Sequence, residues 1–109
     1  MNRVECLKAA EQAVASRGAN YGKPESNFRA VAGLWSTLFG VRVEPHQVAL
    51  AMILLKVARA NYDPTHVDSF VDAAGYAACG IEVATEGNAA DKVVSLARAL
   101  TDPRQDDGA

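Results

Sequence analysis

The sequence predicts an all-α protein, a four-to-five-helix bundle built around a central antiparallel helical hairpin. Alanine dominates the composition, and no stretch alternates apolar and polar residues as a half-buried strand does. The segment 48–58 is apolar at every position except Lys56, and a helix that is apolar all round belongs in the centre of a bundle or in a membrane. Because a membrane span takes about 20 apolar residues, this segment is too short to cross a bilayer. We therefore expect 49–58 to be the most buried part of the bundle.

Length and composition fit one globular domain. At 109 residues the chain has no room for a second core, so 1–101 is assigned to a single helical domain and 102–109 to a disordered tail. Half of the residues are hydrophobic and 22% are charged, which is typical of a globular protein. The formal net charge is −2 and there is no basic block, which excludes an electrostatic footprint for duplex nucleic acid.

The cysteines and the N-terminal residues indicate a cytoplasmic protein. Cys6 and Cys79 are isolated from each other and from metal-ligand spacing, so we expect two thiols rather than a disulfide. The first residues lack the apolar core of a signal peptide, so export is not expected.

Glycine and proline set the expected boundaries of the first two helices and of the hairpin. The first helix is predicted over 2–16 with Gly18 as its C-terminal cap, because glycine accepts the left-handed conformation there. The second is predicted over 25–39 and ends at Gly40. Pro45 begins the first arm of the hairpin, since proline is favoured at the first helical position.

The second arm of the hairpin is predicted over 65–82, after a turn at 61–64. Asp63 or Thr65 is expected to cap this helix, and the segment from Thr65 to Asp68 fits a capping box in which aspartate replaces glutamate. Gly87 is expected to end this helix, and a shorter fifth helix is expected over 89–100.

The connection over 18–27 is longer than the usual helix–helix connection of about 2–8 residues. It carries Tyr21 between two glycines. A long polar loop of this kind is either a binding loop or a structural loop whose tyrosine packs as a lid on the core. The residues alone leave both interpretations open.

Four charged residues gather on the inner parts of the hairpin arms: Lys56, Arg59, Asp68 and Asp72. The two aspartates lie four residues apart, so they share one helical face and could bind Mg²⁺, which takes oxygen ligands. The two basic residues could meet the phosphates of a nucleotide. Alternatively, the four form a structural network in which Asp68 caps its helix or pairs with Lys56, and Asp72 pairs with Arg59.

Three further residues carry two interpretations each. His66 lies beside Asp68 as a possible ligand, although a histidine in a first helical turn is more often a surface residue. Trp35 is more often a core residue than a platform for a base at this helical spacing. Cys79 is predicted to be a small buried hydrophobe.

The chain resembles a family of small phage and prophage proteins over about 4–83. The resemblance rests on four blocks: Tyr21-Gly22-Lys23-Pro24 with Asn27-Phe28; Leu34-Trp35-Ser36; Val48-Ala49 with Met52 to Lys56 and Ala58-Arg59; and His66, Asp68-Ser69 and Asp72 with Ala74-Gly75-Tyr76-Ala77. That family is similar to the MazG-like all-α enzymes, helical bundles that hydrolyse nucleoside triphosphates to the monophosphate and pyrophosphate with Mg²⁺.

The resemblance implies a role for each matched polar or aromatic residue, while the catalytic residues stay unassigned. Metal binding falls to Asp68 and Asp72, and phosphate binding to Lys56, Arg59 and Lys23. The base or sugar would be bound by a larger set: Tyr21, Asn27, Trp35, His66 and Tyr76.

This chain departs from the MazG-like pattern in its acidic residues. Those enzymes gather four acidic ligands from two helices, whereas this chain offers two, and it carries Lys56 and Arg59 where glutamates are expected. Two hypotheses follow. One is a Mg²⁺-dependent nucleoside triphosphate pyrophosphohydrolase, and the other is a module of the same fold that binds a nucleotide or a host protein without catalysis.

A small-residue seam predicts self-association. Gly75 and Gly80 lie among alanines in the second arm, which allows another helix to approach closely. We therefore expect a homodimer with its interface on the central helices. The resemblance to the MazG-like enzymes, which are usually dimeric or tetrameric, implies a dimer or a tetramer, and the resemblance to the phage family implies the cytoplasm of a phage-infected or lysogenic bacterium.

Overall fold

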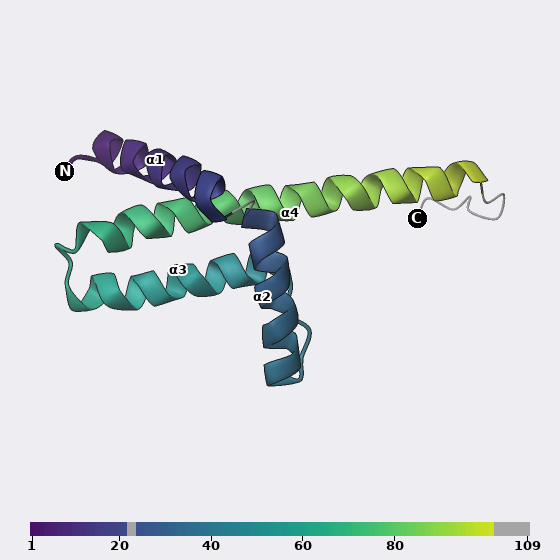
Figure 1. Ribbon diagram of the computed structural model, residues 1–109, viewed down its shortest axis with the longest axis horizontal. Coiled ribbons are helices and arrows are strands. Elements are labelled where there is room, and N and C mark those ends of the chain that lie inside the picture. The colour runs from purple at the N-terminus through teal and green to yellow at the C-terminus, as the bar shows by residue number, and fades with distance from the viewer. Residues whose placement is uncertain (22–23, 102–109) are drawn as a thin grey trace.

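The computed structural model describes the backbone of 1–21 and 24–101 and the side chains of 1–16, 27–86 and 96–101. Over these residues the chain forms helices and no strand, which confirms the all-α class (Figure 1). The helices follow one another as α1 (Arg3–Tyr21), α2 (Pro24–Phe39), α3 (Pro45–Tyr62) and α4 (Val67–Thr101). None of them, within the described residues, is long and apolar enough to cross a membrane.

The start of α3 is fixed by local chemistry. Pro45 stands at its first position, as predicted, after Glu44 in extended conformation. The backbone N–H of Glu44 donates a 2.8 Å hydrogen bond to Oε1 of Gln47, which satisfies a donor at the helix start. Gly40, which ends α2, has a φ of +70°, the left-handed conformation that glycine accepts without strain.

The predicted antiparallel hairpin is formed by α3 and the first part of α4, which run side by side in Figure 1. Gly80 allows their close approach, because a Cβ added there would lie 3.1 Å from the Cβ of Ala49. Ala49 has no exposed surface. Gly75 faces α1 instead, where an added Cβ would lie 3.6 Å from Cγ2 of Val14. The small-residue seam is therefore used inside the chain, by two different neighbours.

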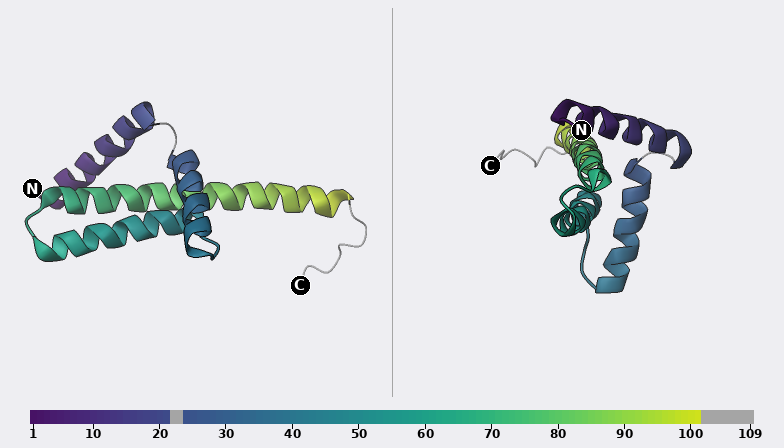
Figure 2. Two further views of the ribbon diagram at one scale, coloured as in Figure 1. Left: turned by 60° about the horizontal axis from the view of Figure 1, so that its bottom comes forward. Right: turned by 90° about the vertical axis from the view of Figure 1, so that its left-hand side faces the viewer.

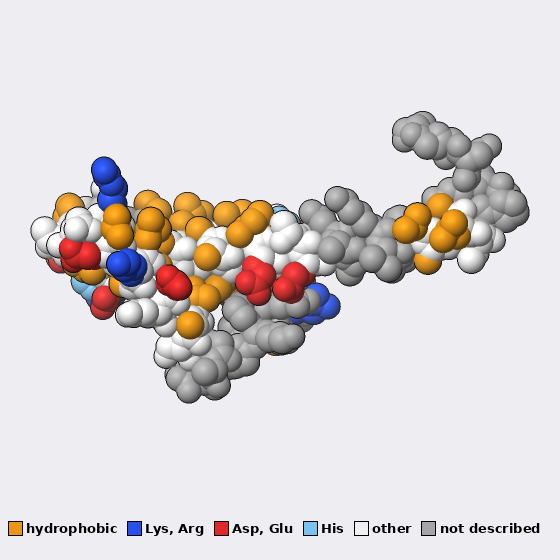
Figure 3. Space-filling model, turned by 90° about the horizontal axis from the view of Figure 1, so that it is seen from above, with side chains coloured by type: hydrophobic (Ala, Val, Ile, Leu, Met, Phe, Trp, Pro, Cys, Tyr) orange, Lys and Arg blue, Asp and Glu red, His pale blue; other side chains and the backbone are white. Residues whose placement is uncertain are grey.

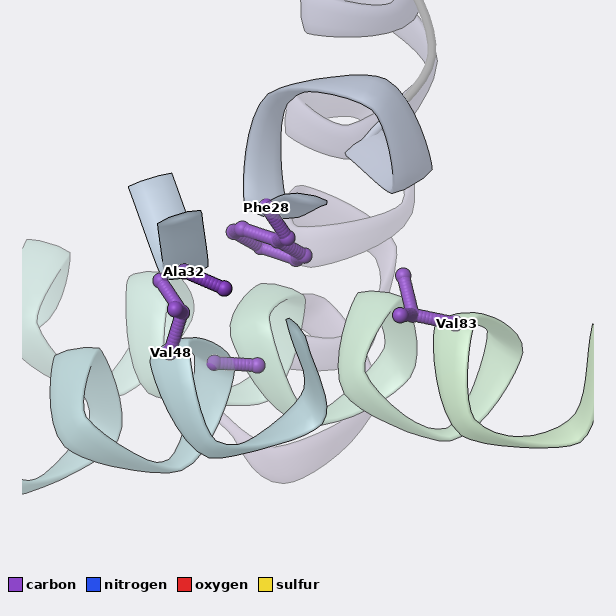
Figure 4. Packing of buried hydrophobic residues seen from close by; sticks show 5 residues of the cluster. Phe28, Ala32, Val48 and Val83 are labelled. Atoms are coloured by element: carbon purple, nitrogen blue, oxygen red, sulfur yellow. The ribbon is translucent and has the colours of Figure 1, made fainter. Parts of the chain in front are cut away.

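The core lies where α2 crosses the hairpin. It consists of Phe28 and Ala32 from α2, Val48 and Ala49 from α3, and Val83 from α4 (Figure 4). The ring of Tyr76 packs against that of Phe28 with 6.3 Å between centroids. These contacts tie α2 to both arms of the hairpin near the start of α3.

The expectation that 49–58 is the most buried segment is wrong for the single chain. Only Val48 and Ala49 of α3 are buried, while Leu50, Leu54 and Val57 are 55%, 68% and 52% exposed. The reason is that α2 and α4 cover only part of the circumference of α3. In the right-hand view of Figure 2, α3 and α4 are seen end-on with α2 on one side, and no described helix lies on the opposite side.

Two expected helix ends are absent. The helix α1 continues through Gly18 to Tyr21, and α4 continues through Gly87 to Thr101, so that the predicted fifth helix is the last part of α4. Glycine costs about 1 kcal/mol inside a helix, and the hydrogen bonds that a continuing helix makes offset this cost. The predicted long loop at 18–27 is correspondingly shorter, since α2 already begins at Pro24. The predicted tail, 102–109, lies outside the described residues.

The long α4 makes the molecule elongated, with extents of 59 × 33 × 30 Å. Its radius of gyration is 17.8 Å, whereas a compact domain of this length has about 13 Å. The C-terminal part of α4 projects past α2, away from the hairpin (Figure 1). One chain therefore forms an open arrangement of helices rather than a closed bundle.

Candidate functional site

An ion pair joins the two arms of the hairpin. Nζ of Lys56 on α3 lies 3.1 Å from Oδ2 of Asp72 on α4, and both side chains are about four-fifths buried. One of the two interpretations drawn from the sequence paired Asp72 with Arg59, and Asp68 with Lys56 or with the start of its own helix. In the structure, Gly80 on α4 lies against Ala49 on α3, and this contact sets the register of the two helices. Asp72 lies eight residues before Gly80 and Lys56 seven residues after Ala49, so the antiparallel arrangement brings Lys56 to Asp72.

An open hollow of about 370 Å³ lies beside this pair, towards the turn of the hairpin. Most of its wall is apolar, and its polar members are Lys56, Asn61 and Ser69. Its apolar lining comes from both arms and from the turn: Val57, Ala60, Pro64, Phe70 and Ala73. The hollow thus combines one ammonium group with a small number of neutral donors and acceptors.

The turn before α4 uses polar groups differently from the predicted capping box. Oδ1 of Asp63 accepts hydrogen bonds from the backbone N–H of Thr65 at 3.1 Å and from its hydroxyl at 2.7 Å. These bonds hold the pKa of the Asp63 carboxyl below its ordinary value. Because α4 begins only at Val67, Asp68 lies in the first turn of the helix and Asp63 takes the role of partner to Thr65.

Ser69 is a site residue that the sequence did not single out. It is 1% exposed, and its hydroxyl lies 2.7 Å from Nδ1 of His66. A serine three residues after His66, at the start of a helix, was the available signal. His66 is half-buried, and this contact joins it to Ser69, which lines the hollow.

The candidate metal ligands are near each other but differ in environment. Asp72 is occupied by Lys56, while Asp68, one helical turn earlier, is exposed. Arg59, one of the predicted phosphate ligands, is exposed on α3. Over the described part of the chain, no three His, Cys, Asp or Glu side chains come close enough to hold a metal ion together.

The described residues among those assigned to a base or sugar lie in different settings. Trp35 and Tyr76 are half-buried and pack against the core, and neither lines the hollow. Asn27 is exposed on α2. The side chain of Tyr21 and all of Lys23 lie outside the described residues. Cys79 packs against the core, as its small apolar character predicted.

Comparison with known proteins identifies relatives for most of the chain. Residues 5–84 match the family described as "Domain of unknown function (DUF6378)". The "Gene 55 protein" of Mycobacterium phage D29 is 44% identical over 63 residues, covering 58% of this chain and 42% of the relative. The "Gene 55 protein" of Mycobacterium phage L5 is 41% identical over 73 residues, covering 65% of this chain and 47% of the relative.

The family match over 5–84 contains the hairpin and the candidate site. The chain spans less than half the length of each of these two curated relatives. Both relatives are phage proteins, in agreement with the phage family that the sequence blocks predicted. No solved structure is significantly similar to the chain.

Proposed function

Since the chain belongs to the family described as "Domain of unknown function (DUF6378)", with relatives in mycobacteriophages, we propose that it is a nucleotide-handling phage protein. Its candidate activity is that of the MazG-like enzymes, Mg²⁺-dependent hydrolysis of a nucleoside triphosphate to the monophosphate and pyrophosphate. The proposed assembly is a homodimer or tetramer.

The Lys56–Asp72 pair beside the hollow is the observation that supports this proposal. An ammonium group held at the edge of an open hollow can exchange its carboxylate partner for a phosphate, because both are anionic oxygen acceptors. Asn61 and Ser69 supply neutral hydrogen-bonding groups to the same hollow, and its apolar wall suits the face of a base or sugar.

Asp68 and Asp72 are suited to bind Mg²⁺ as a complex with the nucleotide. Mg²⁺ is usually held by one or two carboxylates together with substrate phosphates, and Asp68 and Asp72 are two carboxylates one turn apart on α4. Bound there, the ion would neutralise phosphate charge. Lys56 would at the same time lose Asp72 as its partner and become available to a phosphate oxygen.

A nucleotide screen by thermal shift, with and without Mg²⁺, tests the proposal. We expect at least one nucleoside triphosphate to raise the Tm by several degrees in Mg²⁺, and Lys56→Met to abolish this shift. Lys8→Met is the matched control, because Lys8 is an exposed lysine on α1 away from the hollow. Product analysis then decides between hydrolysis, with monophosphate and pyrophosphate, and binding alone. If no nucleotide shifts the Tm, the nucleotide proposal is wrong.

A second candidate is a binding module for a host protein. It is favoured by the outer side of α2, where Leu34, Leu38 and Phe39 are 70%, 75% and 63% exposed. Under this alternative, Leu38→Lys would weaken binding of a purified host target, whereas Lys56→Met would leave it unchanged.

A further inference from the structure

The side of the hairpin turned away from α2 carries a continuous apolar surface, here called the hairpin face. It is formed by Leu50, Leu54 and Val57 on α3 and by Phe70, Ala77 and Ile81 on α4, all of them exposed. The α3 residues are four and three positions apart, and the α4 residues seven and four, so each set forms one stripe along its helix. Figure 3 shows hydrophobic side chains in a row along the edge away from α2.

Charge is almost absent from this part of the molecule. Over 50–57 and 70–81 the only charged residues are Lys56 and Asp72, and these two neutralise each other. A surface without charge offers nothing to a charged partner and does not repel a copy of itself. The occupant it fits is therefore another apolar helical surface of the same width.

The area of the hairpin face is close to what a dimer needs. Its five large residues are between 50% and 68% exposed, which equals about three fully exposed side chains. At roughly 100–150 Å² each, they present about 300–450 Å² of apolar surface, before Ala77 is counted. A standard interface buries about 800 Å² per partner, of which about 65%, roughly 500 Å², is apolar in homodimers.

We propose that the hairpin face binds the hairpin face of a second copy of this chain, so that two hairpins close into a four-helix bundle. A two-fold axis makes the contact isologous, and the same stripe then serves both copies. Leu54 lies near the middle of the face, so the axis passes close to it. Val57 and Phe70, which line the hollow, then face the Leu50 and Ile81 end of the second copy.

This arrangement places the second copy against Val57 and Phe70, two of the residues that line the hollow. If the hollow binds a nucleotide, a consequence that rests on the proposed function, its wall is completed by the second copy. The pairing itself does not depend on any ligand.

Sedimentation velocity of the full chain and of two charge variants tests the proposal. Leu54→Lys places a charge in the hairpin face, and Leu34→Lys is its matched control, because Leu34 on α2 is 70% exposed against 68% for Leu54. We expect the parent chain and Leu34→Lys to sediment as dimers, with twice the chain mass of 11.5 kDa. Leu54→Lys should raise the dissociation constant of the dimer at least a hundredfold. Circular dichroism of the same samples reports whether each variant is folded.

A measurement without variants keeps the proposal testable if Leu54→Lys does not fold. Hydroxyl-radical labelling of the parent chain, followed by mass spectrometry, should modify Leu54 several-fold less than Leu34 at tens of micromolar protein. A monomeric parent chain would overturn the proposal, and so would an oligomer that protects Leu34 and leaves Leu54 labelled. A dimer that binds no nucleotide would contradict the proposed function alone.

Discussion

Lys56 and Asp72 pair across two helices with about four-fifths of each side chain buried, between the limits of a surface ion pair and a fully buried one. Exposed pairs contribute about 0–1 kcal/mol, and breaking a buried pair costs about 3–5 kcal/mol. Lysine can extend its charged end towards water along its apolar stem, which limits the penalty of losing its partner. The pair therefore contributes both to the hairpin and, through Lys56, to the proposed phosphate site.

The variant Asp72→Asn should lower the free energy of unfolding by about 1–2 kcal/mol, because Lys56 loses its carboxylate partner while keeping partial access to water. Urea melts measure this loss, and a double-mutant cycle with Lys56→Met isolates the coupling between the two residues. Asp68→Asn is the control, since Asp68 is exposed one turn away and its loss should cost less than about 0.5 kcal/mol. Equal losses for the two aspartates would contradict the assignment.

The lowered pKa of Asp63 predicts how the stability of the fold depends on pH. Hydrogen bonds from the hydroxyl and the backbone N–H of Thr65 hold its folded-state pKa below the ordinary value of 3.8. Because the pKa is lower in the folded state, the ionised carboxylate of Asp63 stabilises the fold above pH 3.8. This stabilisation is lost as the pH falls through the folded-state pKa. The Tm difference between the parent chain and Asp63→Asn should therefore be constant from pH 7 to about 5 and shrink below pH 4. A difference that stays constant down to pH 2 would rule out this contribution.

The residue types of the candidate site could be predicted, but their pairing could not. Lys56, Arg59, Asp68 and Asp72 stand out because they are the charges on the inner parts of the hairpin arms. Their partners depend on the register between α3 and α4, which is set by the contact of Gly80 with Ala49, 31 positions apart in sequence. No local pattern carries that information.

At the scale of helices, proline and glycine predicted a helix boundary correctly where their effect on the backbone is strong, and wrongly where it is weak. Pro45 removes a backbone donor and Gly40 adopts positive φ, and both boundaries were predicted correctly. Gly18 and Gly87 only lower helix propensity, by an amount that a continuing helix absorbs, so the predicted ends there were wrong. A glycine marks a helix end reliably only when other residues around it also favour termination.

The two glycines inside the hairpin arm should respond differently to alanine. An alanine Cβ at position 75 would meet Val14 at 3.6 Å, an ordinary contact, so Gly75→Ala should stabilise the fold by about 0.5–1 kcal/mol through helix propensity. At position 80 it would lie 3.1 Å from the Cβ of Ala49, which is fixed to its own backbone, so Gly80→Ala should be destabilising. Urea melts measure both changes.

The double variant Ala49→Gly with Gly80→Ala provides the control for this comparison. It moves the methyl group from one helix to the other and should recover part of the stability that Gly80→Ala loses, although glycine at position 49 costs helix propensity. If Gly80→Ala were more stable than Gly75→Ala, the close approach of α3 and α4 at this point would be excluded.

At the scale of the whole molecule, the sequence predicted a closed bundle, whereas one chain forms an open arrangement of helices. The apolar circumference of α3 indicated a helix covered on all sides, yet Leu50, Leu54 and Val57 are exposed. Hydrophobic periodicity reports which faces will be covered, and it does not report whether the cover comes from the same chain. In the proposed dimer, the second hairpin covers the face that α2 and α4 leave open.

A dimer of this kind should make thermal stability depend on protein concentration, because mass action favours the associated folded state. A hundredfold increase changes the free energy of dimer unfolding by about 2.7 kcal/mol, or about 1.4 kcal/mol per chain. For a domain of this size, that corresponds to a rise in Tm of about 5 °C. Calorimetry of the parent chain and of Leu34→Lys over a hundredfold range of protein concentration should show this rise. Folded Leu54→Lys should show a clearly smaller rise, and a rise as large as that of the parent chain would place the interface elsewhere on the molecule.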